Sequence, residues 1–254
     1  MRIQGVETHY REAGEGSPVL LLHGWGSSSE ALAGIADVLV TAFRVVSVDL
    51  PGFGWSQPPP EAWGTGEYTA HVLGILDALR VTKTAVLGHS FGGRIAILLG
   101  ARHPDRVARL VLVASAGIRP LRSVKARLMV GTTTFLRAAA TLPGAGRAAK
   151  RLLDRWRERV GSRDYRQAGR MRPTLVRVVN EDLAPLLPEI GAPTLLLWGD
   201  QDREVGRAAV EMMATRIPKA RMVVFPGAGH FPFEDAPEAF HRELNAFLRA
   251  GERW

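Results

Sequence analysis

Along the first 117 positions, short apolar runs alternate with longer amphipathic stretches. A run of roughly four to eight apolar residues predicts a strand, and apolar residues that recur every three or four positions predict a helix. Strands are predicted at residues 5–13, 19–22, 44–48, 84–87 and 109–114, and helices at 30–40, 67–79 and 91–103. This alternation favours a parallel sheet with helices on both faces.

The alternation stops after Gly117 and resumes at residue 193. Between these points the apolar pattern predicts two helices, at residues 121–142 and 147–160. Beyond them, strands are predicted at residues 193–198 and 220–225 and helices at 207–215 and 237–249. The simplest organisation is one α/β domain over residues 1–254 with a helical cap or lid inserted at 118–187.

A G-x-S-x-G pattern lies where the fourth predicted strand meets a predicted helix. Ser90 stands between Gly88 and Gly92, on a turn that forces a strained backbone on the serine and brings neighbouring backbone close. Such a turn holds a hydroxyl at the tip of a strand, which suits a nucleophile. The structural alternative is that Ser90 only caps the following helix, a position that serine favours.

A serine hydroxyl becomes a good nucleophile only when a base takes its proton, and that base needs an orienting partner. Asp202 and His230 each follow a predicted strand. Because the carboxyl ends of parallel strands meet at one edge, both residues can meet Ser90 there. Asp200 lies in the same turn as Asp202 and is the competing acid.

Five motifs in order resemble those of the α/β-hydrolase fold superfamily, and in particular its serine carboxylesterases. They are His23-Gly24, D-L-P-G-F-G-W-S at 49–56, G-H-S-F-G-G at 88–93, W-G-D-Q-D at 198–202 and G-A-G-H-F at 227–231. The resemblance implies a mostly parallel eight-stranded sheet with helices on both faces and a helical lid. The proline that often follows the family's acid is missing at residues 203–206.

The resemblance also implies a role for each residue of the site. Ser90 would be the nucleophile, His230 the general base and Asp202 its orienting acid. The backbone N–H groups of Trp25 and Phe91 would form the oxyanion hole, which stabilises the tetrahedral intermediate. The expected reaction passes through an acyl-enzyme and needs no metal or cofactor.

Four further side chains are candidates to line the substrate pocket: His89, Phe231, Trp156 and Phe135. Each has an alternative in ordinary packing. His89 is next to the nucleophile and also suits a packing role, and Phe135 and Trp156 belong to the predicted lid helices, where apolar residues more often pack against other helices.

The composition limits the function classes. The chain contains no cysteine, which excludes disulfides, thiolate zinc sites and cysteine catalysis. Its first residues have no apolar core of signal-peptide length, and no apolar run approaches the ~18 residues of a membrane span. We therefore expect a cytoplasmic protein without stable membrane insertion.

The net charge of +8 is unevenly distributed. Residues 118–180 contain 16 Lys and Arg against three acids, so this segment carries +13 and the rest of the chain −5. A solvated arginine-rich face is the ordinary explanation, while attraction of anionic substrates or docking on an acidic membrane surface are functional ones. No recognition motif for nucleic acid accompanies the charge. The sequence leaves a homodimer open.

The residues favour a serine hydrolase that cleaves small to medium carboxylic esters. Within the same superfamily, haloalkane dehalogenases and epoxide hydrolases use an aspartate as nucleophile, which Ser90 argues against. A C–C bond hydrolase of ring-cleavage diketo acids is the main alternative, and a thioesterase, a lactonase or a perhydrolase are further ones. An alternative of another class is a ligand receptor with slow or no turnover.

Overall fold

The computed structural model describes residues 1–119 and 163–250 of the chain. The chain divides into two compact units, one formed by residues 1–119 and 173–254 and the other by residues 120–172. The helices predicted at 121–142 and 147–160 lie outside the described residues, as do the pocket candidates Phe135 and Trp156. No helix in the described ranges is both long and apolar enough to cross a membrane.

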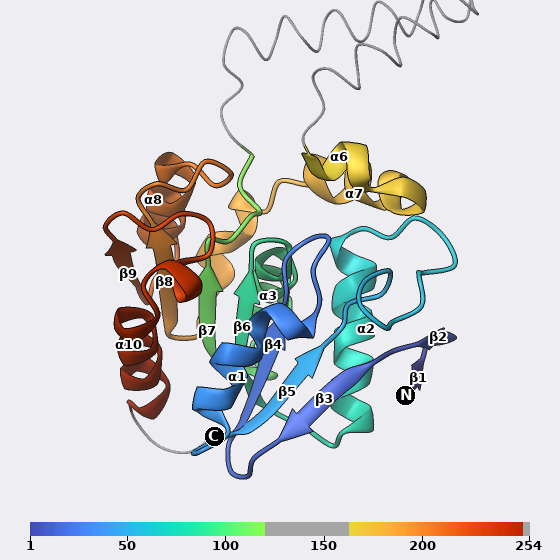
Figure 1. Ribbon diagram of the computed structural model, residues 1–254, viewed down its shortest axis with the longest axis horizontal. Helices are drawn as coiled ribbons and strands as arrows, with labels where there is room; N and C mark the ends of the chain where they lie inside the picture. Colours follow the sequence, from blue (N-terminus) through green and yellow to red (C-terminus); the bar gives the residue numbers. More distant parts are fainter. Residues whose placement is uncertain (120–162, 251–254) are drawn as a thin grey trace, which may run out of the picture. The chain divides into compact units, whose positions relative to one another are not determined.

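The first unit is built on a seven-stranded sheet whose strands follow the order β3-β5-β4-β6-β7-β8-β9 (Figure 1). The strands are β3 (Tyr10–Ala13), β4 (Pro18–Leu22), β5 (Arg44–Val48), β6 (Thr84–His89), β7 (Val107–Val113), β8 (Thr194–Gly199) and β9 (Ala220–Phe225). Strand β3 is antiparallel to β5, and the other neighbouring pairs are parallel. The mostly parallel α/β architecture predicted from the sequence is confirmed.

The expectation of eight strands is wrong for the residues that the structure describes. The first two strands, β1 (Arg2–Ile3) and β2 (Val6–Glu7), pair with each other in a separate small sheet. Gln4 and Gly5 turn the chain between them with positive φ values of 50° and 81°, as a two-residue hairpin requires. The strand predicted at 5–13 is therefore broken between β2 and β3.

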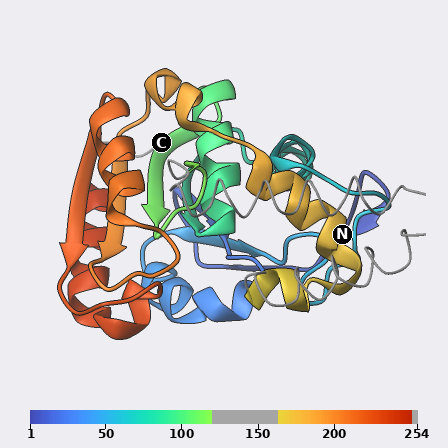
Figure 2. The same ribbon diagram turned by 90° about the horizontal axis from the view of Figure 1, so that it is seen from above.

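Helices cover both faces of the main sheet. They are α1 (Ala33–Leu39), α2 (Thr65–Ala78), α3 (Phe91–Arg102), α8 (Arg207–Arg216), α9 (Pro232–Asp235) and α10 (Pro237–Arg249), with 3-10 turns η1 (Ser29–Leu32) and η3 (Ala184–Glu189). Helices α1 and α10 lie on one face, and α2, α3 and α8 on the other (Figure 2). The predicted helices of this unit are confirmed to within about two residues.

Alternate residues of the central strands point to opposite faces, and both faces are covered, which explains the continuous apolar runs in these strands. Val19 and Leu21 of β4 join one buried cluster with Leu39 of α1 and Leu244 of α10, while Leu20 and Leu22 are buried outside that cluster. A strand buried on both faces needs no polar side, so the apolar runs of the sequence lie at the centre of the sheet.

The two chain segments that flank residues 120–172 are joined within the first unit. The N–H of Leu183 donates to the carbonyl of Gly117 at 2.9 Å, and Nη2 of Arg119 donates to Oδ1 of Asn180 at 2.9 Å. Asn180 ends helix α7 (Arg172–Asn180). The second unit has a short described part, helix α6 (Arg163–Gln167) and the 3-10 turn η2 (Gly169–Met171).

Candidate active site

Ser90 lies on the turn between β6 and α3, with φ 49° and ψ −108°. A positive φ is rare for a residue with a side chain and marks local strain. A Cβ atom on Gly88 would lie 2.6 Å from the carbonyl carbon of Gly92, and one on Gly92 would lie 2.6 Å from that of Leu22. Both distances are too short for real contacts, so this turn accepts only glycine at the two positions.

The environment of Ser90 does not match that of a simple helix cap. Ser90 occupies the N-cap position of α3, but its side chain makes no capping hydrogen bond. The backbone holds the turn instead: the N–H of Ser90 donates to Val113 at 3.0 Å, and its carbonyl accepts the N–H of Ala116 at 3.1 Å. The turn is thus held by backbone contacts, and within the described residues the hydroxyl takes no part in holding it.

Asp202 and His230 form a hydrogen-bonded pair at the carboxyl ends of β8 and β9. Nδ1 of His230 lies 2.9 Å from Oδ2 of Asp202, whose side chain is fully buried. The other oxygen, Oδ1, accepts the N–H groups of Glu204 at 2.8 Å and Val205 at 3.0 Å. Burial works to raise the pKa of Asp202, but these hydrogen bonds outweigh it, so its pKa lies below the ordinary value.

The carboxylate of the competing acid, Asp200, forms its hydrogen bonds with groups other than His230. Its Oδ1 accepts the N–H of Gly227 at 2.8 Å and the side-chain amide of Gln201 at 3.1 Å. It therefore joins the loop after β8 to the loop after β9. Of the two acids in this turn, the structure brings Asp202 to His230.

His89 is buried beneath His230. Its Nε2 lies 3.0 Å from the carbonyl oxygen of His230, and the two rings are 5.0 Å apart. A carbonyl only accepts, so Nε2 carries the proton of a neutral ring. Burial, helped by the nearby His230, lowers the pKa of His89 to about 3. The residue predicted to line the pocket thus supports the backbone of His230, and at 3 % exposure it has little surface to offer a ligand.

The His23-Gly24 turn lies against the Ser90 turn. Nε2 of His23 accepts the N–H of Leu50 at 2.9 Å, so Nδ1 carries the proton and donates to the carbonyl of Gly24 at 2.7 Å. Burial lowers the pKa of His23 and keeps this ring neutral. The N–H of Gly92 donates to the carbonyl of His23 at 3.1 Å, which joins the two turns directly.

Trp25 and Phe91, the predicted oxyanion-hole residues, stand on these two joined turns. Their rings meet edge to face with centroids 5.3 Å apart. Within the described part of the chain, neither backbone N–H donates to a protein acceptor. Phe53 and Tyr68 pack around them, with ring centroids 4.8 Å from Trp25 and 5.0 Å from Phe91 respectively. Sequence reasoning missed this aromatic cluster, which packs around the side chains of both residues.

Two acidic residues near His230 were also missed. Oε2 of Glu204 lies 3.4 Å from Nε2 of His230, the ring nitrogen opposite Asp202. Asp235 accepts the N–H of Gly229 at 2.7 Å and so supports the loop that carries His230. The sequence held one signal that could have identified Glu204: it follows Asp202 by two residues, inside the same loop.

Asp49 has a structural environment. Its buried carboxylate accepts the N–H groups of Ser29 at 2.7 Å and Trp55 at 2.9 Å, and contacts Nδ1 of His9 at 2.9 Å. In residues 1–119 and 163–250, no group of three or more histidine or acidic side chains is placed to hold a metal ion.

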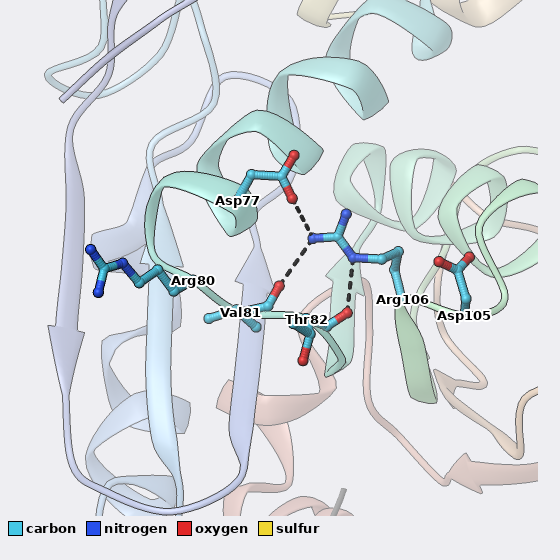
Figure 3. A pocket seen from close by; sticks show the side chains of 6 residues that line it. All are labelled: Asp77, Arg80, Val81, Thr82, Asp105 and Arg106. Carbon is cyan, nitrogen blue, oxygen red and sulfur yellow. Dashed lines mark hydrogen bonds and ion pairs between the residues drawn. The ribbon is translucent and has the colours of Figure 1, made fainter.

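An open cavity of about 490 Å³ lies at the other edge of the sheet, near the amino ends of β6 and β7 (Figure 3). Its lining includes Arg106, whose guanidinium donates to Asp77 at 2.7 Å and to the carbonyls of Thr82 at 2.9 Å and Val81 at 3.0 Å. These bonds fasten the end of α2 to the start of β7. The cavity contains none of the candidate catalytic residues.

Comparisons with known proteins agree with this architecture. A family model described as alpha/beta hydrolase fold matches residues 17–237. A 2-hydroxymuconate semialdehyde hydrolase of Pseudomonas putida is 31% identical over 96% of this chain and 91% of its own. A pimeloyl-[acyl-carrier protein] methyl ester esterase of Aliivibrio salmonicida is 30% identical over 95% of both. The crystal structure of a bacterial membrane phospholipase A, 28% identical, superimposes with a TM-score of 0.77 over 98% of this chain and 84% of that one.

Proposed function

The chain belongs to the α/β hydrolase fold family, and on that premise we propose that it is a serine hydrolase that cleaves carboxylic esters through an acyl-enzyme. One observation carries the proposal: the buried Asp202–His230 pair, 2.9 Å apart, stands at the same edge of the sheet as the strained turn that presents Ser90. A serine on a strained turn and an oriented histidine at the same edge of the sheet are the groups that acyl transfer needs.

In the first half of the reaction, Ser90 Oγ attacks the ester carbonyl carbon while Nε2 of His230 takes the hydroxyl proton. Because Asp202 accepts a hydrogen bond from the N–H at Nδ1, Nε2 has its lone pair available for this step. The carbonyl oxygen becomes an oxyanion that the N–H groups of Trp25 and Phe91 stabilise. The tetrahedral intermediate then expels the alcohol, which takes the proton back from Nε2.

In the second half, water replaces the alcohol. Nε2 of His230 takes a proton from the water as its oxygen attacks the acyl carbon. The second tetrahedral intermediate collapses, the proton returns to Ser90 Oγ and the carboxylic acid leaves. This sequence uses only the chain's own residues and one water molecule.

Cleavage of a C–C bond is the second candidate. The relative named as a 2-hydroxymuconate semialdehyde hydrolase supports it, while the relative named as a methyl ester esterase supports ester cleavage at almost the same identity. Both reactions can use the same serine, histidine and aspartate. Only the substrate separates the two candidates.

The segment at 118–187 is proposed as a cap over the site. Its support is the junction between Gly117 and Leu183, because Gly117 lies just beyond the carboxyl end of β7, the edge that also carries Ser90. Active sites of parallel sheets gather at that edge, so a segment that leaves and returns there can border the substrate.

The test is the variant Ser90→Ala, which removes the nucleophile and nothing else. We expect hydrolysis of p-nitrophenyl esters to fall by about 10⁶-fold in kcat, with unchanged thermal unfolding. Ser17→Ala, at the amino end of β4, is the matched control and should retain full activity. Ester hydrolysis by Ser90→Ala at the parent rate would contradict the proposal.

A substrate panel separates the alternatives. p-Nitrophenyl esters of graded acyl length are run beside a ring-cleavage diketo acid. Turnover of the esters supports an esterase, and turnover of the diketo acid alone supports a C–C hydrolase. A receptor would release one equivalent of p-nitrophenol and then stall, or release none.

A further inference from the structure

Glu204 places a negative charge at the reacting nitrogen of the site. Its Oε2 lies 3.4 Å from Nε2 of His230, and its side chain is 63% exposed, against 9% for the imidazole. Its backbone N–H donates to Asp202, so the backbone is held while the side chain can move. In the described part of the chain, Glu204 forms no ion pair with a lysine or arginine.

The position of this carboxylate determines what it can contact. In ester hydrolysis, Nε2 of His230 delivers its proton to the oxygen of the departing alcohol. A group within 3.4 Å of Nε2 therefore borders the alcohol portion of the substrate rather than its acyl chain. The proposed reaction assigns no step to Glu204, so its charge is available for recognition.

The ring of Phe231 is a second group that favours positive charge near His230. Its ring meets the imidazole of His230 edge to face, with centroids 5.3 Å apart, and it is 39% exposed. The face of an aromatic ring attracts cations, including quaternary ammonium groups. The carboxylate and the ring thus both favour positive charge next to the imidazole.

On the basis of the proposed ester hydrolysis, we infer that Glu204 is a specificity-determining residue that selects esters whose alcohol portion carries a positive charge. The same carboxylate disfavours alcohol portions that carry a carboxylate. A unit charge about 4 Å away in water-like surroundings changes an interaction by about five-fold, and this is the expected size of each preference in kcat/KM.

The experiment compares three butyrate esters that differ in the alcohol: choline, its neutral isostere 3,3-dimethylbutanol, and glycolate. The wild-type enzyme should hydrolyse them in decreasing order of kcat/KM from cation to anion. Glu204→Gln should bring the choline and dimethylbutyl esters to within about two-fold of each other, and Glu204→Lys should favour the glycolate ester. Glu211→Gln, an equal charge change on α8, should leave the order intact.

The outcomes separate this inference from the proposed function. Equal choline-to-dimethylbutyl ratios in the wild type and Glu204→Gln would overturn the inference alone, as would the same loss of ratio in Glu211→Gln. A uniform fall for all three esters in Glu204→Gln would also overturn it, because a charge preference must discriminate between them. Failure of the wild type to hydrolyse any ester would overturn the proposed function and this inference with it.

Discussion

Two loops at the carboxyl edge of the sheet hold their functional side chains in different ways. The turn after β6 has backbone hydrogen bonds and is in addition closed to side chains by steric contact, because backbone atoms of Leu22 and Gly92 lie where Cβ atoms of Gly92 and Gly88 would stand. The loop after β8 is fixed by hydrogen bonds: Trp198 Nε1 donates to the carbonyl of Val205 at 2.9 Å, and two N–H groups hold Asp202.

The difference teaches where each loop can change. At Gly88 and Gly92 steric exclusion leaves no alternative to glycine. Adding one methyl group at either position should therefore disrupt the β6–α3 turn. Hydrogen bonds to backbone N–H groups leave the side chains between them unconstrained, so the loop after β8 can carry a new charge such as Glu204 without moving Asp202. Four changes test this contrast, in order of decreasing effect.

The largest effect is expected from Asp202→Asn in the hydrogen-bonded loop. The amide can keep the loop but cannot hold the His230 tautomer that leaves Nε2 free, so kcat should fall by about 10⁴-fold with little change in stability. Asp200→Asn is the matched control, because its amide oxygen can still accept the N–H of Gly227. Similar kcat values for the two variants would contradict the assignment of the acid.

Gly92→Ala tests the sterically fixed turn. The added methyl group meets backbone of Leu22, which cannot rotate away, so we expect a loss of about 4 kcal/mol in the free energy of unfolding. Gly34→Ala is the control, since a Cβ there meets nothing within 4 Å and should stabilise α1 by up to about 1 kcal/mol. Chemical denaturation measures both, and equal stabilities would contradict the steric account.

The pH dependence of the free energy of unfolding distinguishes the two loops, because His89 of one and Asp202 of the other contribute over different pH ranges. The folded protein keeps His89 neutral, with a pKa of about 3, whereas the unfolded chain protonates it near pH 6.5. The free energy of unfolding should thus fall as the pH drops from about 6.5 towards 3, by up to about 1.4 kcal/mol per pH unit. Asp202, whose pKa is lowered, adds a loss only below about pH 4.

The variant His89→Gln should flatten the upper part of this titration, because its amide can donate to His230 without titrating. Part of the slope should remain, since buried His71 has a pKa lowered to about 4 and is protonated on unfolding over the same range. Denaturation series at pH 7, 5.5 and 4.5 measure the slope. An unchanged slope would contradict the assignment of His89.

The smallest effect is expected from Gly206→Pro, in the stretch of residues 203–206 that lacks the proline expected after the acid. Gly206 has φ −70° and ψ 150°, which proline adopts without strain, and it precedes α8. The substitution should raise the free energy of unfolding by about 0.5–1 kcal/mol, because proline lowers the conformational entropy of the unfolded chain. The value of kcat should not change. A loss of activity would mean that the loop after β8 needs the glycine to move.

Sequence reasoning reached the sheet and the order of its elements because buried strands such as β6 contain a short apolar run that ends at glycine or polar residues. It also predicted Ser90, Asp202 and His230 as one group; the structure pairs Asp202 with His230, and the part of Ser90 in that group stays a prediction. It failed where a residue's role depends on distant neighbours. Glu204 and His89 have their roles through their contacts with His230, and neither contact can be read from adjacent residues.

The N-terminal error has a similar cause. The pattern over residues 5–13 is compatible with one strand, but the turn at Gln4 and Gly5 pairs Val6 and Glu7 with the first residues instead. Buried Thr8, whose Oγ1 lies 2.8 Å from Nε2 of His71, marks the break. A hydrogen bond to a helix 63 residues away is not visible in a local pattern.

The hydrogen bond between Leu183 and Gly117 makes the protein modular. Residues 120–172 form a unit separate from the α/β frame, and the entropy of closing a flexible loop rises by only about 0.6 kcal/mol for each doubling of its length. We therefore expect that segments of other lengths and sequences can be exchanged between Arg119 and Pro173 at little cost to the frame. We expect substrate preference to evolve by such exchange, while the residues around Ser90 stay as they are.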